Sequence, residues 1–353
     1  MSICIANYNH RDFVGAAVDS ALAQTYPGVE VVVVDDGSTD ASLDVLRAYG
    51  ERIRLIEQAN QGQVVAWNEA FAASVGDVVL FLDSDDLLHP DAMSRVVAAR
   101  GPHTAKVQFR LQIIDAQGEV LGVYPHRLLE LDEGDVRPLL CREGDYIGPV
   151  TSGNAYVRAA LARVLPLDQG DFATGAERWG PDGYLNAMTP FFGDVTSIDE
   201  VLGSYRSHGG NHSALSGTVG LAFARWRIMH EVRREVEIRR LAAEQELPVK
   251  AELMCANPEH VLLRLLSLRS PGEHPVPHDA RRSLVRALVV RGTRFHSSPP
   301  ARRLFVVLVG LLCAALPVRL VPLAASWTLA NRPRPWPLRL LASLVGNRRR
   351  SAP

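Results

Sequence analysis

The first hundred residues repeat one pattern, in which a short apolar run, a polar loop and a segment with apolar residues at helical spacing follow one another. Apolar runs without polar alternation are typical of strands buried on both faces of a parallel sheet, whereas apolar residues three or four positions apart predict amphipathic helices. Right-handed crossovers then bring the polar loops to one edge of the sheet, where open α/β sheets bind ligands. We expect strands at 1–6, 29–34, 53–56 and 78–82, and helices at 12–24, from 43, at 63–74 and at 90–99.

The strand expected at 78–82 ends in three carboxylates within four residues, Asp83, Asp85 and Asp86. Because carboxylates repel one another, folding alone gives no reason to gather them there. One interpretation is a divalent-cation clamp for a phosphorylated substrate, and the other is a solvated turn that caps the next helix. The glycine signatures of dinucleotide-binding and P-loop proteins are absent, so a metal held by carboxylates is the remaining way to neutralise a diphosphate.

The region from 104 to 212 predicts smaller elements between less regular loops. Strands at 106–114 and 119–123 form a hairpin, and closing strands are expected at 191–198 and 203–205. Asp182 opens an apolar helical segment, and Arg206 and His208 lie in the polar loop that follows the last strand.

Beyond residue 212 the pattern is helical. A long charged helix is expected at 217–245, followed by helices at 258–268 and 278–290. The uncharged segment 304–316 is shorter than the roughly 20 residues that span a bilayer. Arginines before and after it suit an interfacial helix pair lying on an anionic leaflet, and the alternative is an ordinary buried helix.

Composition narrows the class of protein. A chain of 353 residues with 47% apolar residues is globular, with two domains or one domain and a large extension. The net charge of -1 gives no general attraction to nucleic acid, so no nucleic-acid partner is expected. Four widely separated cysteines indicate free thiols in a reducing compartment. No basic and apolar leader precedes the first strand, so the catalytic part is expected in the cytoplasm.

Several of these loops resemble one family. The segments Ser2–Asn9, Val34–Asp40, Asn60-Gln61-Gly62 with Asn68, and Leu82–Asp86 are similar, in order and spacing, to family 2 glycosyltransferases of the GT-A fold. The resemblance covers about residues 1–212. It implies an α/β fold with a Rossmann-like, mostly parallel sheet, helices on both faces and a helical C-terminal extension. The implied catalytic domain is 1–212, with a nucleotide-sugar half at 1–100 and an acceptor half at 101–212. The pattern beyond it adds a helical extension at 213–300 and an apolar and basic segment at 301–353 that we expect to contact the membrane.

The resemblance also assigns the donor site. Asp36 would accept a hydrogen bond from the nucleobase, usually uracil. Asp83 and Asp85 match the family's Asp-x-Asp pair, which holds the ribose and a Mg²⁺ or Mn²⁺ ion, with His208 as a further ligand. Arg206 and His208 would belong to a loop that closes over the diphosphate. The full set implied to bind the nucleotide is Ala6, Asn7, Tyr8, Asp36, Asn60, Gly62, Asn68, Asp83 and Ser84.

On the acceptor side, Asp182 matches the family's general base, which takes the proton from the acceptor hydroxyl. Pro181 stands where relatives often have Glu, and Asp171 and Glu177 are rivals for the role. The processive Gln-x-x-Arg-Trp signature is absent, which favours transfer of one sugar per encounter. The segment implied to flank the acceptor is Thr151, Ser152, Gly153 and Asn154.

We therefore expect a metal-dependent, inverting glycosyltransferase that moves a sugar from a nucleotide sugar, usually UDP-linked, to a glycan or lipid-linked acceptor in bacterial surface glycan synthesis. Its expected place is the inner face of the cell membrane. The alternatives are a non-catalytic nucleotide-sugar-binding subunit and a sugar-nucleotide pyrophosphorylase. The lack of a Gly-rich phosphate loop with Arg and Lys after the first strand counts against the second alternative.

Overall fold

The computed structural model describes residues 1–168, 170, 173–174, 177–178, 181–208, 221–251, 253, 257–270, 272–292 and 300–318. At 173–174, 177–178, 222–223, 291–292 and 300–302 only the backbone is described. The chain divides into two compact units. The first consists of Met1–Pro138 and Ile147–His208, and the second of Leu139–Tyr146 and the described residues after His208.

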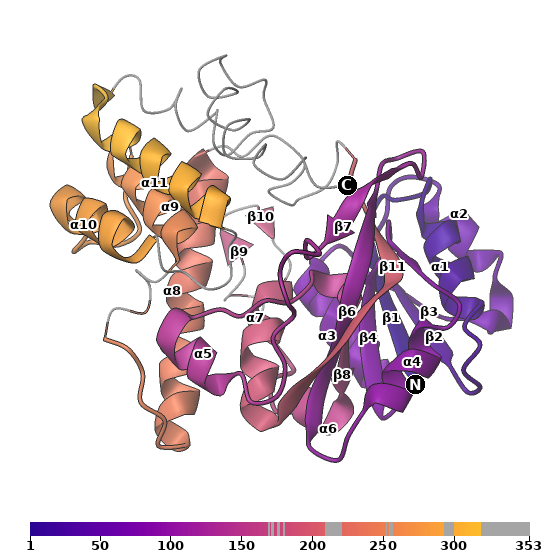
Figure 1. Ribbon diagram of the computed structural model, residues 1–353. Helices are drawn as coiled ribbons and strands as arrows, with labels where there is room; N and C mark the ends of the chain where they lie inside the picture. The colour runs from indigo at the N-terminus through magenta and orange to yellow at the C-terminus, as the bar shows by residue number, and fades with distance from the viewer. Residues whose placement is uncertain are drawn as a thin grey trace, which may run out of the picture. The chain divides into compact units, whose positions relative to one another are not determined.

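The first unit is built on a mixed, mostly parallel sheet. Its strands are β1 (Ser2–Asn7), β2 (Glu30–Asp35), β3 (Arg54–Glu57), β4 (Val78–Asp83), β5 (Leu87–Leu88), β6 (Thr104–Ile114), β7 (Val120–Tyr124), β8 (Asn154–Val157) and β11 (Asp194–Arg206). Their order is β3-β2-β1-β4-β8-β6-β11-β5, with β7 paired to β6 (Figure 1). Strands β5, β7 and β8 pair antiparallel to their neighbours, whereas β3, β2, β1 and β4 are parallel, as are β6 and β11. A separate antiparallel pair is formed by β9 (Ala173–Thr174) and β10 (Glu177–Arg178).

Helices cover both faces of this sheet because its central strands are apolar on both sides. Ile3 and Ile5 of β1 belong to one buried cluster, and Cys4 between them belongs to the other. The helices of this unit are α1 (Val14–Leu22), α2 (Ser42–Arg47), α3 (Gln63–Ala73), α4 (Ala92–Ala99), α6 (Arg158–Leu161) and α7 (Asp182–Met188). Helices α1, α2 and α4 lie on one side, and α3 and α7 on the other (Figure 1).

The strand and helix positions predicted for the first hundred residues agree with the structure to within a few residues. The two predicted closing strands at 191–198 and 203–205 are instead one strand, β11. Its register against β6 shifts between Ile198 and Gly203, and this irregularity breaks the apolar pattern that a continuous strand would give. Phe191 lies before the strand in a short 3-10 turn, Thr189–Phe192.

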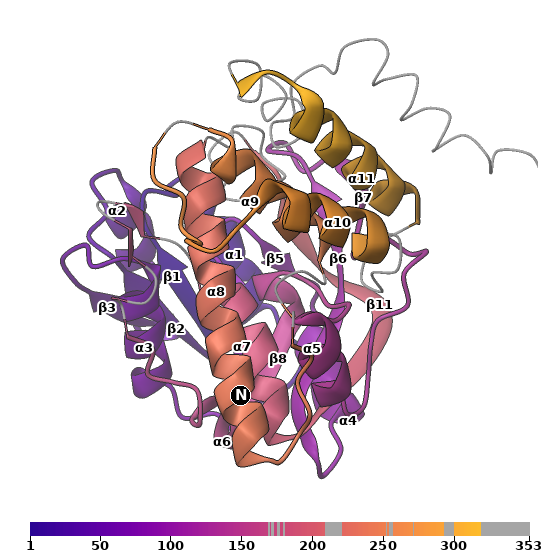
Figure 2. The same cartoon turned by 90° about the vertical axis from the view of Figure 1, so that its left-hand side faces the viewer.

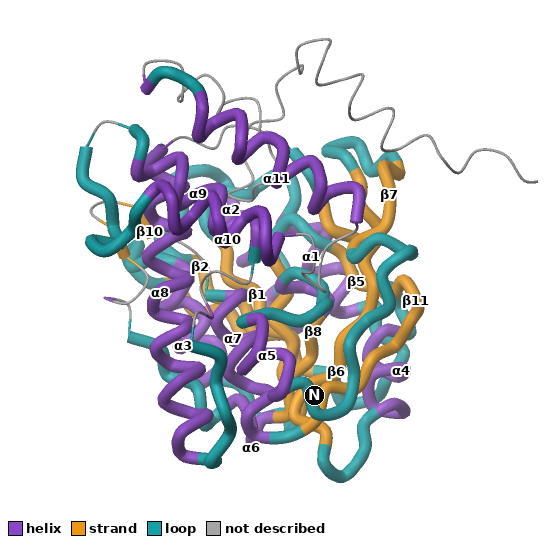
Figure 3. Tube along the Cα trace, turned by 60° about the vertical axis from the view of Figure 1, so that its left-hand side comes forward, coloured by secondary structure: helices purple, strands orange, loops and turns teal. Residues whose placement is uncertain are grey.

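The second unit contains α8 (Leu221–Glu244), α9 (Pro258–Leu268), α10 (Arg281–Gly292) and α11 (Pro300–Ala315), together with the segment 139–146, which includes most of α5 (Arg137–Glu143). Helices α9, α10 and α11 pack against one another, as Figures 2 and 3 both show. Their common core includes Val261, Leu265, Leu288 and Val307. Within the described ranges, every helix is too short or too polar to cross a membrane.

Candidate active site

The polar residues that end the parallel strands lie at one edge of the sheet. Asn7 of β1 is in register with Asp35 of β2, and Ala6 is in register with Asp83 of β4. On the other half of the sheet, Ile114 of β6 is in register with Arg206 of β11. The loops that follow these strands therefore meet at the carboxyl edge, which is the ligand-binding edge of open α/β sheets.

The loops after β1 and β2 are joined by side-chain hydrogen bonds. Asn7 Nδ2 donates to Asp35 Oδ1 at 2.8 Å and to Ser38 Oγ at 3.1 Å. Asn9, whose φ is 58°, accepts from Thr39 N at 2.7 Å through its side-chain oxygen. Asn7 is buried and supports the loops from beneath, whereas the Tyr8 side chain is 45% exposed. Of these predicted site residues, Tyr8 is the one available to a ligand from solvent.

Asp36 fastens the loop after β3 to the loop after β2. Its Oδ1 accepts from Gln58 Nε2 at 2.7 Å and from Gln61 N at 2.8 Å, and its Oδ2 accepts from Gly62 N at 2.7 Å. Gly37 is needed for this approach, because its φ is +72° and a Cβ there would lie 2.6 Å from Asn60 N. A carboxylate has about four acceptor positions, so these three protein donors leave capacity for one ligand donor.

Asp86 anchors the turn that carries the three carboxylates. Its side chain is fully buried and accepts from Ser152 Oγ at 2.6 Å and from Arg206 N at 2.8 Å. Ser152 Oγ in turn accepts from Asp83 N at 3.1 Å. Burial, aided by the charges of Asp85 and Asp83, raises the pKa of Asp86 well above its usual range. Asp86 therefore fixes the turn, and Asp83 and Asp85 are the carboxylates that we expect to contact a ligand.

Asp83 and Asp182 lie close enough for their charges to interact. Burial raises the pKa of Asp83 well above its usual range, and repulsion from Asp85 and Asp182 adds to that effect. Gln63 Nε2 lies 3.4 Å from Asp83 Oδ1. Asp182 is the first residue of α7, so the start of this helix is near the end of β4.

A second group of ligand atoms forms around Asp85. His208 Nε2 lies 2.9 Å from Asp85 Oδ2, and one nitrogen of His10 completes a group whose atoms are all within 4.8 Å of one another. His10 Nδ1 is 2.7 Å from Ser84 Oγ, and the ring of Phe13 stacks on His208 with centroids 4.8 Å apart. His10 is not among the residues predicted from the sequence, although an imidazole directly after the Asn7-Tyr8-Asn9 loop is a usable signal. Asp83 is not a member of this group.

Arg206 contacts backbone carbonyl groups. Its Nε donates to Asp85 O at 2.8 Å, and its Nη1 lies 3.3 Å from Asp115 O. The guanidinium also lies over the ring of Phe13, 5.1 Å from the centroid. Since the side chain is buried, its contacts hold the turn at Asp85 in place.

The segment predicted to flank the acceptor, Thr151–Asn154, is buried beneath the carboxylate turn. Asn154 Oδ1 accepts from the buried Lys106 Nζ at 2.7 Å, and a Cβ at Gly153 would lie 2.8 Å from Phe109 O. These contacts, with those of Ser152, give the segment a supporting position.

The remaining predicted residues are dispersed. Asn68 exchanges hydrogen bonds with the backbone of Leu167, at 2.9 and 3.0 Å, and so holds that loop to α3. Asn60 is exposed and Gly62 is half-buried. Of the two rivals for the base, Asp171 lies outside the described residues, and only the backbone of Glu177 is described.

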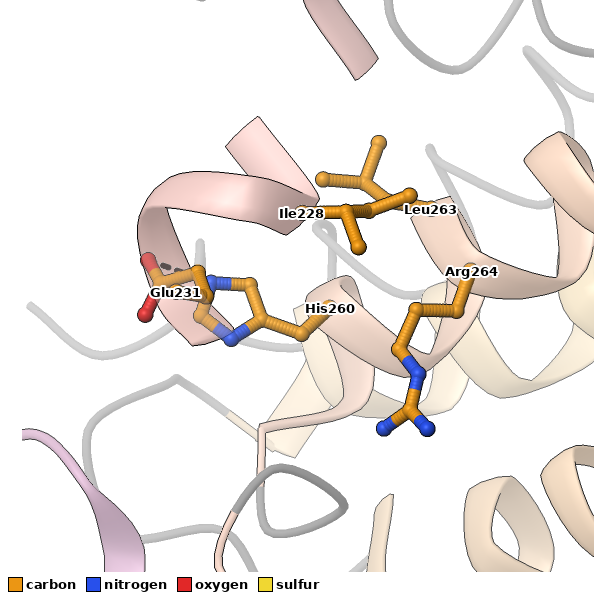
Figure 4. Close-up of a pocket in the computed structure, with 5 residues that line it drawn as sticks. All are labelled: Ile228, Glu231, His260, Leu263 and Arg264. Atoms are coloured by element: carbon orange, nitrogen blue, oxygen red, sulfur yellow. Dashed lines mark ion pairs between the residues drawn. The ribbon is translucent and has the colours of Figure 1, made fainter. Parts of the chain in front are cut away.

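A small pocket within the helical unit is lined by Ile228, Glu231, His260, Leu263 and Arg264 (Figure 4). Glu231 lies 2.8 Å from both His260 Nε2 and Arg234 Nη2. Burial alone would raise the pKa of Glu231, but Arg234 and His260 outweigh it and hold the pKa well below its usual range. Glu231 is thus a buried, compensated charge that joins α8 to α9.

Comparison with known proteins decides the family. Residues 2–118 match the model for glycosyl transferase family 2. The chain is 38% identical over 226 residues to an uncharacterised glycosyltransferase of Nostoc sp. This alignment covers 62% of this chain and 68% of the Nostoc protein. The chain belongs to glycosyltransferase family 2. The predicted α/β class, with helices on both faces of the sheet and a helical C-terminal part, is confirmed.

Other proteins match shorter parts of the chain or share less sequence. The putative teichuronic acid biosynthesis glycosyltransferase TuaG of Bacillus subtilis is 38% identical over 99 residues, 27% of this chain and 39% of TuaG. The crystal structure of S. aureus TarS in complex with UDP aligns over 89% of both chains with 15% identity and a TM-score of 0.49. The chain thus spans about two thirds of the Nostoc relative and about two fifths of TuaG.

Proposed function

We propose that this family 2 glycosyltransferase is a cation-dependent, inverting enzyme that transfers a sugar from a UDP-sugar to an acceptor hydroxyl. The observation that carries the proposal is the meeting of three chemistries at one sheet edge: the Asp36 carboxylate, the group around Asp85 and His208, and the Asp182 carboxylate near Asp83. Asp36 can accept a hydrogen bond from the nucleobase, Asp85 and His208 can bind a cation, and Asp182 can take a proton from the sugar acceptor.

Asp36 supports uracil as the base. The carboxylate is 3% exposed and held by three protein donors, so its position is fixed before the ligand arrives. Its remaining acceptor capacity suits the single N–H of the uracil imide. The exposed ring of Tyr8, on the neighbouring loop, offers a surface for the base.

The chemistry of the residues around Asp85 fits a divalent cation. Asp85 and His208 would hold it, and Asp83 would face the ribose. When bound, Mg²⁺ or Mn²⁺ stabilises the negative charge of the departing nucleoside diphosphate. Arg206 keeps Asp85 in position through its bond to the Asp85 carbonyl oxygen.

Asp182 is our proposed general base. It would take the proton of the acceptor hydroxyl while the new C–O bond forms at the anomeric carbon and the bond to the diphosphate oxygen breaks on the opposite side. A single displacement of this kind inverts the anomeric configuration. Asp182 is the first residue of α7.

For the whole chain we propose a role in bacterial surface glycan synthesis, with a glycan or lipid-linked acceptor, at the cytoplasmic face of the membrane. The similarity to TuaG supports the glycan class. Four exposed leucines of α11, 38–46% exposed and spaced along one face, support peripheral contact with lipid: Leu304, Leu308, Leu311 and Leu312. We also keep as a proposal the division into a catalytic domain at 1–212, a helical extension at 213–300 and a membrane-contacting segment at 301–353.

A donor panel tests the proposal. We expect UDP-sugars, in the presence of Mn²⁺, to raise the melting temperature more than GDP-sugars do and to release UDP on turnover. Asp85→Ala should abolish release, whereas the matched surface variant Asp44→Ala should keep it, because Asp44 is exposed on α2. Full turnover in Asp85→Ala, or turnover unaffected by a chelator, would contradict cation dependence.

A further inference from the structure

The group formed by His10, Asp85 and His208 contains more histidine than the carboxylate pair Asp83 and Asp85 that the sequence suggests as a cation site. Two of its three members are imidazoles, and their ligand atoms and that of Asp85 all lie within 4.8 Å of one another. The residues come from the loop after β1, the turn after β4 and the end of β11, so the fold alone brings them together. Asp85 is 7% exposed, and so its charge is already removed from most of the solvent.

The three side chains are held in place by their surroundings. His10 Nδ1 is bonded to Ser84 Oγ, and the His10 ring meets the ring of His208 edge-on, with centroids 5.8 Å apart. The ring of His208 stacks on the ring of Phe13, and the guanidinium of Arg206 also lies over the Phe13 ring. Hydrogen bonds from neighbouring side chains orient histidine ligands in metal sites, and Ser84 stands in that relation to His10.

Ligand type sets the class of ion. Carboxylates, carbonyls and water suit Mg²⁺, whereas imidazole nitrogens suit the first-row transition metals, with affinity rising from Mn²⁺ through Co²⁺. Three protein ligands can also hold such an ion without a diphosphate, as in catalytic metal sites that keep one position for water or substrate. A site that relies on one or two carboxylates usually needs the substrate phosphates to complete it.

We infer that His10, Asp85 and His208 form a three-ligand site that binds a transition-metal divalent ion in the donor-free protein, in preference to Mg²⁺. His10 is thereby a metal ligand, and the ion is in place before the nucleotide sugar arrives. The inference rests on the proposed function, since the same ion is the one that meets the diphosphate.

Direct metal binding to the full chain tests this without an activity measurement. Co²⁺ is titrated into metal-free protein with no nucleotide present, followed by its visible absorption and by calorimetry. We expect one ion per chain, intense absorption of a low-coordinate site, and no comparable binding of Mg²⁺. His10→Ala and His208→Ala should each weaken Co²⁺ binding about 10-fold or more, because even the loss of an outer partner of a ligand costs about that much.

Two further variants control the comparison. His103→Ala removes an exposed histidine far from the group in sequence and should leave the bound Co²⁺ unchanged. His10→Asn keeps a polar side chain beside Ser84 but lacks the imidazole, so it should behave like His10→Ala and retain the wild-type melting temperature.

Wild-type Co²⁺ affinity in both His10 variants would overturn the assignment of His10. Donor-free protein that binds neither Co²⁺ nor Mn²⁺, yet transfers sugar only when a cation is added, would overturn the inference and leave the proposed function intact. Transfer that needs no cation would instead contradict the proposed function.

Discussion

Ser152→Ala is the most direct test of how the carboxylate turn is held. The Ser152 hydroxyl is fully buried, donates to Asp86 Oδ2 at 2.6 Å and accepts from Asp83 N at 3.1 Å. Alanine removes both bonds and leaves two buried polar groups without their partner. Because an unsatisfied buried group costs about 1–3 kcal/mol, we expect the loss of both bonds to lower the free energy of unfolding by about 2–6 kcal/mol.

The same change should weaken nucleotide binding, since the Ser152 bonds fix both ends of the turn from Asp83 to Asp86. The assay is urea unfolding, followed by circular dichroism, together with UDP affinity in the presence of Mn²⁺. Thr189→Val is the matched control. Its hydroxyl is fully buried, and within the described part of the chain it has no hydrogen-bond partner. Deleting that hydroxyl should be neutral or slightly stabilising.

Equal unfolding midpoints for Ser152→Ala and Thr189→Val would refute the reasoning, because both variants remove a buried hydroxyl and, within the described residues, only that of Ser152 has hydrogen-bond partners. A large loss of stability with unchanged UDP affinity would keep the energetic argument but separate the turn from the donor site.

Three other outcomes follow from the structure. Asp182→Asn should lower sugar transfer by about 10²–10⁴-fold with UDP affinity kept, and wild-type turnover would move the base to Asp171 or Glu177. Burial lowers the pKa of His230 to about 3, so below about pH 6.5 the unfolded chain binds a proton there that the folded chain does not. Stability should therefore fall by about 2 kcal/mol between about pH 7.5 and about pH 5, and His230→Leu should flatten this slope in pH-dependent unfolding. Leu308→Asp on α11 should reduce sedimentation with anionic liposomes, whereas Val236→Asp, at an exposed position of α8, should not; equal binding by both would argue against lipid contact through α11.

The sequence was most informative where each element carries its own signal. The strands β1, β2 and β4 each contain a short apolar run because both of their faces are buried, and the polar loop that follows each run marks its end. The two-residue strand β5 and the short strand β8 carry no such signal, since their pairing is set by neighbours far away in the sequence.

The same distinction applies to the site. Three adjacent carboxylates were evident, but the sequence could not tell which one is buried as an anchor. That depends on Ser152 and on the backbone of Arg206, which arrive from distant segments. His10 was missed for a similar reason, because its partners Asp85 and His208 come from other strands. Arg206 and Asn68 both bond to backbone groups of distant segments, and the sequence pattern gave no sign of these contacts.

The short segment Leu139–Tyr146 has a consequence for how this enzyme can be divided or recombined. It is flanked on both sides by residues of the first unit, yet it belongs to the helical unit. There, Cys141 O accepts from Lys250 N at 3.0 Å, and Gly144 faces Leu253. Leu140 and Cys141 are buried, and truncation after His208 would therefore expose them to solvent. The helical unit therefore cannot be exchanged as one continuous segment. A chimaera between relatives would need to take Leu139–Tyr146 and the residues after His208 from the same parent.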